Sequence, residues 1–490
     1  MTKQECAIKY ITENYLDYRR LRHDIVTDKL QVRVAHSLED ASLQNAPEGL
    51  QFRGSEYWRE MTKHDINSIV CHAAQEYDAN ITSREVMTAL QSDLIPDVHP
   101  LREYVLSCGE WTAEQPDWID LVASQVRVRE SATDRCEAPV DRHFVAVDGR
   151  SAAPEDRPTG CSVLRESTAS ITSDPQCSAS ETNYSEANYS EPRERSKADA
   201  LWRVCFKKWF VAMVASWMKD EVVNHQVLVL IGRQGIYKTT WLEHLIPPHL
   251  RAYACKLANS NDLNKDERLR IAEFGLISLD EIDSMNNREL NQLKSVITAT
   301  DVNERAAYAY TKERRVRLAS FCASGNRRDF LTDITGNRRW LPFEVESIQN
   351  PFYTILPYER MYAQAWALAQ DPLFSYWFDL DEIEVLEEHN QHFRDESNEE
   401  QLLPILFDVP AEGKGEFMTT AQISERLVTY GNIKKPMALG RLGVLMGSMG
   451  YRSVTRGNRQ ARLRGWIVYQ RDTEEIAANK KLLAKECVTV

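Results

Sequence analysis

The segment Val227-Leu-Val-Leu-Ile-Gly-Arg-Gln-Gly-Ile-Tyr-Lys-Thr-Thr240 determines how the rest of the sequence is interpreted. Its first five residues, 227–231, are apolar and are interrupted neither by polar alternation nor by helical spacing, which predicts a buried parallel strand. A turn with two glycines follows, and Trp241-Leu242 then opens a short helix that Pro247-Pro248 ends. A strand, a glycine turn, Lys-Thr and a helix in this order are typical of a loop that binds phosphate groups.

The residues expected to contact a nucleotide form one continuous run: Gly232, Arg233, Gln234, Gly235, Ile236, Tyr237, Lys238, Thr239 and Thr240. In such a loop Lys238 places a point charge beside the β- and γ-phosphates, and the Thr239 hydroxyl is a ligand for Mg²⁺. Tyr237 stands where the standard pattern has a glycine, which lets the backbone approach the phosphates closely. Tyr237 therefore either adopts a conformation that a side chain tolerates or alters the affinity for nucleotide. The alternative interpretation is an ordinary glycine turn that leads into a core helix.

A second apolar stretch, Phe274-Gly-Leu-Ile-Ser-Leu279, ends in the carboxylates Asp280 and Glu281. At phosphoryl-transfer sites the first such carboxylate helps to hold Mg²⁺, and the next polarises the attacking water. If both stretches are parallel strands, their carboxyl ends lie at the edge of the sheet that presents the phosphate loop. The alternative is a strand that leads into a polar helix cap, because Asp283-Ser284 precedes an expected helix through 291–298.

A third strand is expected over Val316–Ala323, followed by Ser324-Gly325-Asn326. At that edge Asn326 would orient the water or sense the γ-phosphate, and a simple Gly-Asn turn is the alternative. Further on, Thr335-Gly-Asn-Arg-Arg-Trp340 contains Arg338 and Arg339. Paired arginines on a turn suit an arginine finger that reaches the γ-phosphate of a neighbouring subunit, and a surface pair bound to carboxylates explains them equally well.

Aromatic and basic residues alternate between the second and third strands, from Arg305 to Arg317. The pattern predicts a hairpin that stacks on bases and binds the backbone of single-stranded DNA. A solvated basic hairpin is the alternative. The residues expected to contact DNA here are Tyr308, Tyr310, Lys312, Arg314 and Arg315.

Beyond Pro404 two helices are expected, one beginning at Thr419-Thr420 and one over Met437–Met449. The alternating stretch Tyr451–Tyr469 turns at Arg456-Gly457-Asn458, which predicts a hairpin. Helix, helix and basic hairpin is the order of a winged helix, and one that contacts only protein is the alternative. The arginines expected to contact DNA phosphates are Arg452, Arg456, Arg459, Arg462 and Arg464.

The chain has 490 residues, a formal net charge of −13 and 43% hydrophobic residues, as expected for an ordinary soluble protein of two to four domains. The negative charge argues against wholesale coating of nucleic acid but not against a local basic surface. Ten cysteines without a Cys-x-x-Cys pair or zinc spacing predict reduced thiols. With no signal-peptide core and no apolar run long enough to span a bilayer, we expect a cytoplasmic protein with no membrane contact.

The expected organisation has six parts, in which a stretch rich in Ser, Thr, Glu, Asp and Pro separates two ordered regions. These parts are a mostly helical N-terminal region (1–130), a disordered linker or insertion (131–197), a nucleotide-binding domain (198–345), a helical and acidic connector (346–402), a winged-helix-like domain (403–475) and a tail (476–490).

With these elements in order, the chain resembles the virulence-associated protein E family, a set of phage and mobile-element ATPases related to superfamily-three helicases. The resemblance covers about 95–115 and 200–345, and family members commonly carry an N-terminal primase. Residues 1–130 contain no Asp-x-Asp metal motif, so priming by this chain is not expected. The matching residues are His99-Pro100-Leu-Arg-Glu-Tyr104 with Trp111, Gly232-x-Gln234-Gly235-x-x-Lys238-Thr239, Leu279-Asp280-Glu281, Tyr308 with the basic run after it, Ser324-Gly325-Asn326 and, most specifically, Thr335-Gly-Asn-Arg-Arg-Trp340.

The motifs and the resemblance together predict an α/β protein with a P-loop NTPase core, an AAA+-like parallel sheet that uses ATP and Mg²⁺. The leading hypothesis is an ATP hydrolase, a helicase or translocase that works as a homo-oligomeric ring on single-stranded or forked DNA during replication of a phage or mobile element. The alternative is an ATP-binding, DNA-associated regulator or initiator that uses nucleotide for assembly. The residues expected to act in catalysis are Lys238, Glu281, Asn326, Arg338 and Arg339.

Overall fold

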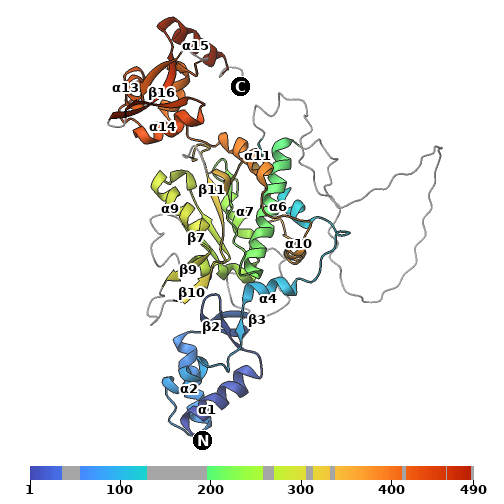
Figure 1. Ribbon diagram of the computed structural model, residues 1–490. Coiled ribbons are helices and arrows are strands. Elements are labelled where there is room, and N and C mark those ends of the chain that lie inside the picture. The colour runs from blue at the N-terminus through green and yellow to red at the C-terminus, as the bar shows by residue number, and fades with distance from the viewer. Residues whose placement is uncertain are drawn as a thin grey trace, which may run out of the picture.

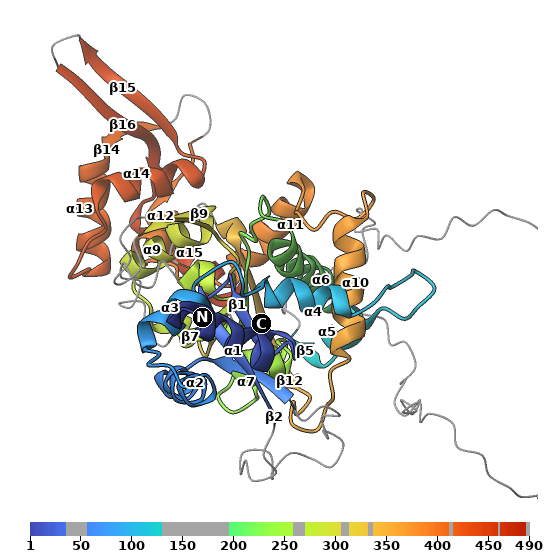
Figure 2. The ribbon, with the colours of Figure 1, turned by 90° about the horizontal axis from the view of Figure 1, so that it is seen from below.

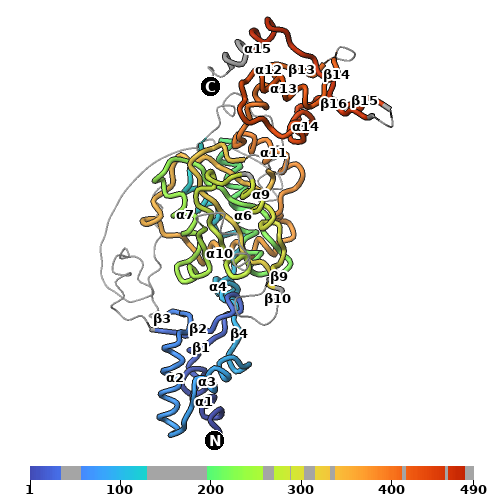
Figure 3. The backbone as a smooth tube through the Cα atoms, turned by 90° about the vertical axis from the view of Figure 1, so that its left-hand side faces the viewer, coloured from blue at the N-terminus to red at the C-terminus, as the bar shows by residue number. Residues whose placement is uncertain are grey.

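The computed structural model describes residues 1–35, 56–129, 196–257, 270–304, 313–331, 337–410, 415–458 and 461–486. Figures 1 and 3 show three parts that follow one another along the molecule, with the N-terminal part at one end and the C-terminal part at the other. The linker expected at 131–197 falls almost entirely outside the described residues.

The central part contains a six-stranded sheet in the order β5-β12-β6-β11-β8-β7. Its last five strands are parallel, and only β5 runs antiparallel to its neighbour β12. A mixed α/β fold with a parallel sheet is thus confirmed. The strands are β5 (Val126–Val128), β12 (Trp340–Ile348), β6 (Val227–Ile231), β11 (Ser320–Gly325), β8 (Leu276–Leu279) and β7 (Ala254–Leu257).

The register of these strands decides which residues meet at the edge of the sheet. Gly325 at the end of β11 pairs with Ile231 at the end of β6, and Ala323 pairs with Leu279 at the end of β8. The glycine loop after β6, the carboxylates after β8 and the turn after β11 therefore leave the sheet on the same side. This common edge is the feature that the sequence predicted.

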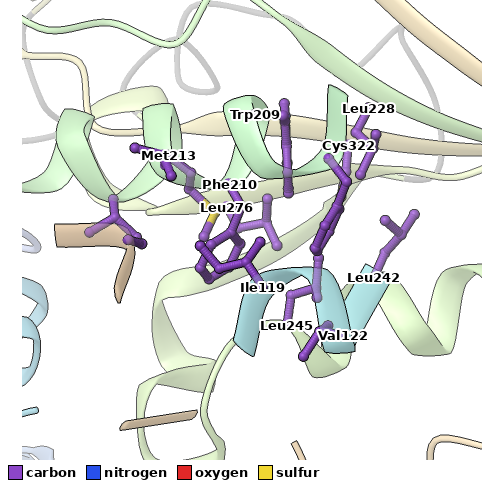
Figure 4. Close-up of a cluster of buried hydrophobic side chains, with 14 of the residues drawn as sticks. Ile119, Val122, Trp209, Phe210, Met213, Leu228, Leu242, Leu245, Leu276 and Cys322 are labelled. Atoms are coloured by element: carbon purple, nitrogen blue, oxygen red, sulfur yellow. The ribbon is translucent and has the colours of Figure 1, made fainter. Parts of the chain in front are cut away.

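Helix α6 (Lys197–Met218) runs through the middle of the central part and is buried nearly all round. Figure 4 shows Trp209, Phe210 and Met213 of this helix in one cluster of buried side chains with Leu228, Leu276 and Cys322 of the sheet. The helical spacing of the aromatic residues alone would leave Lys207 and Lys208 on an exposed face. Both lysines are instead ion-paired, Lys207 with Asp117 and Lys208 with Glu382 at 2.5 Å, because other helices cover that face too.

The described residues of the N-terminal part contain more helix than strand, but they also contain a sheet that the sequence did not predict. A four-stranded sheet, β3-β2-β1-β4, packs with three helices, the last of which begins at a capping box formed by Thr82 and Glu85. Three of the strands have only two to five residues and show no clear pattern, but Lys29–Ala35 alternates apolar Leu30, Val32 and Val34 with polar residues, a strand signal that was overlooked. The elements are α1 (Lys3–Ile11), η1 (Thr12–Leu16), β1 (Leu21–Asp24), β2 (Lys29–Ala35), β3 (Glu56–Glu60), α2 (Lys63–Glu76), α3 (Ser83–Leu90) and β4 (Asp97–Val98).

Residues 100–129 pack with the central part, although the sequence placed them in the N-terminal region. Helices α4 (Pro100–Ser107) and α5 (Trp118–Ala123) share a hydrophobic core with α6, and β5 extends the central sheet. The indole of Trp202 in α6 donates a hydrogen bond to the Ala123 carbonyl at 2.9 Å. The boundary of the central part therefore lies near residue 99.

Further elements surround the sheet and connect it to the C-terminal part. They are α7 (Lys238–His244), η3 (Pro248–Tyr253), η5 (Ile282–Ser284), α9 (Asn287–Thr298), β9 (Asp301–Glu304), β10 (Glu313–Val316), η6 (Asn337–Arg339), α10 (Tyr358–Gln370), α11 (Leu380–Gln391) and α12 (Asn398–Leu406). No helix among the described residues is long and apolar enough to cross a bilayer.

The C-terminal part contains the predicted pair of helices followed by the predicted hairpin. Strand β16 pairs with β13, β14 and β15, and the hairpin formed by β15 and β16 extends away from the rest of the molecule in Figure 2. The turn falls after Asn458, two residues later than the sequence suggested, because Gly457 pairs with Arg462. The elements are β13 (Phe407–Asp408), β14 (Glu416–Thr419), α13 (Thr420–Gly431), α14 (Leu439–Ser448), β15 (Arg452–Asn458), β16 (Ala461–Gln470) and α15 (Thr473–Glu486).

Arg317 explains why β11 begins at Ser320 rather than at the expected Val316. Its guanidinium is fully buried and donates to the carbonyls of Ala319 at 3.0 Å and Asn224 at 2.9 Å, and to three carbonyls, including that of Ala299, at the end of α9. Burial lowers the pKa of Arg317 to about 9. Arg317, which the sequence grouped with residues expected to bind DNA, therefore caps the C-terminal end of α9 inside the core.

We expect Arg317→Met to lower the free energy of unfolding by about 3 kcal/mol or more, since several buried carbonyls lose their donor and each costs about 1–3 kcal/mol. The measurement is urea unfolding followed by tryptophan fluorescence. The matched control is Arg288→Met, which changes an exposed arginine at the start of α9 and should shift the midpoint little. Equal stability of the two variants would contradict this role of Arg317.

Candidate functional site at the carboxyl edge of the central sheet

The glycine loop after β6 is held between two strands. The Gly232 N–H donates to the Gly325 carbonyl of β11 at 3.1 Å, and a Cβ on Gly232 would lie 2.7 Å from the Val345 carbonyl oxygen of β12. Gly235 has a φ of +83°, and a Cβ added to it would meet no other atom within 4 Å. A glycine is therefore favoured at 235 by the backbone conformation and not by close packing. The two glycines of the motif are therefore needed for different reasons, close packing and backbone twist.

Tyr237 adopts a left-handed conformation, with a φ of 68° and a ψ of 19°. A glycine would take this conformation without strain, whereas a tyrosine takes it at a cost. The phenol ring lies edge-on to Phe352 at 6.4 Å, and the Asn350 amide donates to its hydroxyl at 3.4 Å. The ring thus contacts the segment after β12. Tyr237 is therefore accommodated in the glycine loop by a strained backbone and by a ring that points to this segment.

Lys238 is buried at the start of α7, and its ammonium group lies inside the loop. It donates to the carbonyls of Gly232 and Arg233, both at 2.7 Å, and to the Asn326 side-chain oxygen at 3.3 Å. Burial lowers the pKa of Lys238, and the nearby carboxylates of Asp280 and Asp283 oppose that shift. The lysine therefore connects the glycine loop to the turn after β11.

Three oxygen-bearing side chains from three elements meet beside Lys238. The Thr239 hydroxyl lies 2.9 Å from the Ser324 hydroxyl and donates to Asp280 Oδ1 at 3.3 Å. Ser324 donates to the same carboxylate oxygen at 2.7 Å. Helix α7 and the ends of β11 and β8 thus converge on a single oxygen atom of Asp280.

The second oxygen of Asp280 is occupied by a residue that the sequence did not suggest. Lys256 of β7 lies 2.8 Å from Asp280 Oδ2. Burial would raise the pKa of Asp280, but the Lys256 ammonium and the Ser324 and Thr239 hydroxyls outweigh it and keep the pKa below its usual value. Asp280 is therefore an ionised carboxylate at neutral pH.

Glu281 also has a left-handed backbone, with a φ of 52°, and its side chain is exposed. Non-glycine residues in this conformation are uncommon and often belong to functional sites. The neighbouring Asp283 accepts hydrogen bonds from the backbone N–H groups of Asn326 at 3.1 Å and Arg327 at 3.2 Å. Asp283, which the sequence assigned to a helix cap, thus orders the turn that carries Asn326.

Arg338 and Arg339 lie at the opposite edge of the same sheet. Trp340, the next residue, pairs with Val227 at the start of β6, whereas the glycine loop follows Ile231 at its end. Five residues of strand separate the two edges, a distance of roughly 15 Å. The arginines therefore do not reach the glycine loop of their own chain.

The basic hairpin expected between the second and third strands is present as β9 paired with β10, but its tip, residues 305–312, lies outside the described residues. Of the five residues predicted to contact DNA there, Tyr308, Tyr310 and Lys312 belong to that tip. Arg314 lies in β10 opposite Asn303. Arg315 is ion-paired with Asp28 at 3.1 Å and so links the hairpin to the N-terminal part.

The C-terminal arginines are exposed but do not form one surface. Directly paired residues of antiparallel strands share a face, and Arg456 pairs with Leu463 while Thr455 pairs with Arg464. Arg452 and Arg456 therefore lie on one face of the β15–β16 hairpin, and Arg462 and Arg464 lie on the other. Arg459 is outside the described residues.

Among the described residues no group of three His, Cys, Asp or Glu side chains could hold a metal ion alone. The Thr239 hydroxyl and the Asp280 carboxylate nevertheless fit Mg²⁺, which prefers oxygen ligands and takes several of them from water and phosphate. Their shared contact at 3.3 Å supplies the two protein ligands that such an ion uses.

The geometry defines a mixed α/β domain whose glycine loop, lysine and acidic strand end meet at one sheet edge. A model of the virulence-associated protein E-like domain matches residues 193–400, less than half of the chain. No curated protein sequence matches the chain.

Two solved structures of one protein are similar over nearly the whole chain. The apo structure of the NrS-1 C-terminal region (305–718) has 9% identity and a TM-score of 0.38, and the match covers 95% of this chain and 100% of that one. The A form apo structure of the same region has 8% identity and a TM-score of 0.39, with 95% and 99% covered.

The left-handed backbone at residue 237 predicts that Tyr237→Gly unfolds with a higher free energy than Tyr237→Ala, by about 1 kcal/mol. Both variants remove the ring, so the difference between them isolates the cost of a Cβ in this conformation. Urea unfolding of the two variants measures it. The conformation assigned to residue 237 is wrong if the alanine variant is as stable as the glycine variant.

Proposed function

We propose that the chain is an ATP hydrolase that drives translocation on or unwinding of DNA, and that it serves the replication of a phage or mobile element. The single observation that carries the proposal is the convergence of Lys238, Thr239, Ser324 and Asp280 at one sheet edge. The carboxyl edge of a parallel sheet is where nucleotides bind in this class of folds. The match of residues 193–400 to the virulence-associated protein E-like domain supports the same class.

In the proposed site Lys238 leaves its loop carbonyls and pairs with the β- and γ-phosphates of ATP. Thr239 and Asp280 would hold Mg²⁺, which would supply positive charge beside the phosphates. Ser324 keeps the carboxylate of Asp280 oriented toward Thr239. The two groups already lie within hydrogen-bond distance of each other, but Mg²⁺ would have to compete with the contacts that Asp280 makes with Lys256, Thr239 and Ser324.

Glu281 is proposed to orient the attacking water, because its carboxylate is exposed at the edge next to Asp280 and is not drawn into the ion pair with Lys256. Asn326 contacts Lys238 and is held by Asp283, so it is proposed to report the γ-phosphate to the turn after β11. Lys256 and Lys238 both have protein partners in this structure. Their contacts would have to be exchanged in each cycle, which favours a slow turnover.

The proposal predicts that Lys238→Ala abolishes nucleotide binding and hydrolysis, whereas Glu281→Gln keeps binding but lowers kcat by about 100-fold or more. Phosphate release and equilibrium nucleotide binding measure the two steps separately. The control is Glu221→Gln, which removes an exposed carboxylate outside the site. Near-normal hydrolysis by either site variant would remove the assignment.

A homo-oligomeric ring is proposed because the arginines at the opposite edge have no access to the glycine loop of their own chain. In a head-to-tail ring that edge of one subunit can face the nucleotide of its neighbour. Arg338 and Arg339 would then stabilise the charge on the γ-phosphate in trans.

A mixing experiment tests the arginine assignment. We expect Lys238→Ala protein and Arg338→Ala/Arg339→Ala protein each to be inactive. An equal mixture should regain about one quarter of the wild-type hydrolysis. An active interface needs Lys238 from one subunit and both arginines from its neighbour, and random assembly of the two variants forms about one quarter of the interfaces in this way. A mixture as inactive as its components would show that the arginines do not act across subunits.

The proposed DNA contacts are the exposed arginines of the β15–β16 hairpin and the tip of the β9–β10 hairpin. A projecting hairpin with cations on both faces can enter a groove or lie between two strands, where phosphates are present on both sides. DNA-stimulated ATP hydrolysis and opening of a forked duplex test the motor. Binding of DNA and assembly with nucleotide, but without stimulation or opening, would instead favour the initiator or regulator.

A further inference from the structure

Three aromatic side chains gather beside the glycine loop, and the proposed chemistry uses none of them. The ring of Phe352 lies edge-on to Tyr237 at 6.4 Å and to His244 at 5.6 Å. They come from the loop, from the last turn of α7 and from the segment that follows β12. We call these three residues the aromatic cluster.

The cluster is open to solvent. Phe352 is 57% exposed and Tyr237 is 38% exposed, so both rings keep accessible apolar surface. Large exposed rings in contact with one another mark sites for ligands or partners more often than isolated ones do. The strained backbone at Tyr237 makes the position more informative, because a tyrosine is kept where a glycine would be easier to accommodate.

The strand order places the cluster on a defined side of the loop. The loop strand β6 has β11 and then β8 on one side and β12 on the other. Lys238 and Thr239 contact Asn326, Ser324 and Asp280, all on the β11 side. The γ-phosphate and Mg²⁺ would therefore lie on that side, and the other end of an extended nucleotide points toward β12.

The segment after β12 is ordered by its own hydrogen bonds. The Phe352 N–H donates to the Asn350 side-chain oxygen at 3.0 Å, and the Thr354 hydroxyl donates to the Asn350 carbonyl at 3.1 Å. The backbone that carries the Phe352 ring is thus ordered before any ligand arrives, which lowers the entropic cost of binding.

His244 is the third member of the aromatic cluster. Its Nδ1 lies 2.7 Å from the Thr240 carbonyl and must donate the proton of that hydrogen bond. Burial lowers the pKa of His244. The hydrogen bond to Thr240 acts in the opposite direction, because it favours the protonated ring, but the effect of burial is larger. The imidazole is therefore neutral at pH 7 and presents no charge to an aromatic ligand.

We propose that Tyr237, Phe352 and His244 form the subsite for the base of a purine nucleoside triphosphate. The base stacks on the exposed rings while its phosphates lie in the glycine loop, so the inference rests on the function proposed above for the phosphate end. Stacking of a base on an aromatic side chain contributes about 1–3 kcal/mol. A larger purine gains more contact than a pyrimidine, and the stacking compensates for the strained backbone of Tyr237.

The experiment compares a nucleotide with a ligand that has no base. Calorimetry in the presence of Mg²⁺ gives Kd for the slowly hydrolysed ATP analogue adenylyl imidodiphosphate and for inorganic tripolyphosphate. We expect Phe352→Ala to weaken the analogue about tenfold, within the range that stacking provides, and to leave tripolyphosphate unchanged. Phe352→Trp should retain analogue binding, and Tyr353→Ala, which removes an 83% exposed ring next to Phe352, is the matched control.

Five results would overturn the inference. Phe352→Ala could bind the analogue normally, or it could lose both ligands equally, which would make Phe352 a support for the loop. It could change the oligomeric state without changing the analogue Kd, which would assign the cluster to a protein contact. If wild-type protein binds tripolyphosphate as tightly as the analogue, the base subsite is excluded but the proposed function is not. If wild-type protein binds neither ligand, both the base subsite and the proposed function are excluded.

Discussion

The contact between Thr239, Ser324 and Asp280 is the interaction on which the rest of the central part depends. It brings the start of a helix and the ends of two strands to within hydrogen-bond distance of one carboxylate oxygen. Such a contact requires β6, β11 and β8 to be parallel and in register, because a shift of one residue would turn each side chain to the other face. The register in turn depends on the buried helix α6 and on the Arg317 cap, which fix where the strands begin.

The sequence predicted the parts of this edge that have a strong local signal. The strand Val227–Ile231 was predicted with the bounds that the structure has, since five consecutive apolar residues before a glycine turn allow few alternatives. Asp280 and Glu281 were placed correctly because a buried strand leads directly into them. The β15–β16 hairpin was predicted because its alternating pattern is long, although its turn was misplaced by two residues.

Other features depend on contacts between distant segments and have no local signal. Lys256 is one basic residue on a short strand, and only the sheet order shows that it reaches Asp280. In the N-terminal sheet three strands are too short to show a pattern, whereas the period-two alternation of Lys29–Ala35 is an exception, because it was a local signal that was overlooked. Arg317 resembles a surface arginine in the sequence, and its burial follows from the carbonyls left by the end of α9. The sequence did not decide which backbone conformation Tyr237 adopts, because that depends on whether the fold leaves room for its ring outside the glycine loop.

The order of the strands divides the surroundings of the glycine loop into two unlike sides. The β11 and β8 side supplies an ionised carboxylate and hydroxyls, which suit phosphate and Mg²⁺, whereas the β12 side supplies exposed rings. A molecule that is highly charged at one end and aromatic at the other matches this division, and neither side alone would select it. The opposite edge of the sheet holds Arg338 and Arg339, about a strand length away. Lys256 already supplies a second cation beside Asp280. Under the proposed function, Arg338 and Arg339 would reach the site only from a second copy of the chain, so the strand order is compatible with the proposed ring.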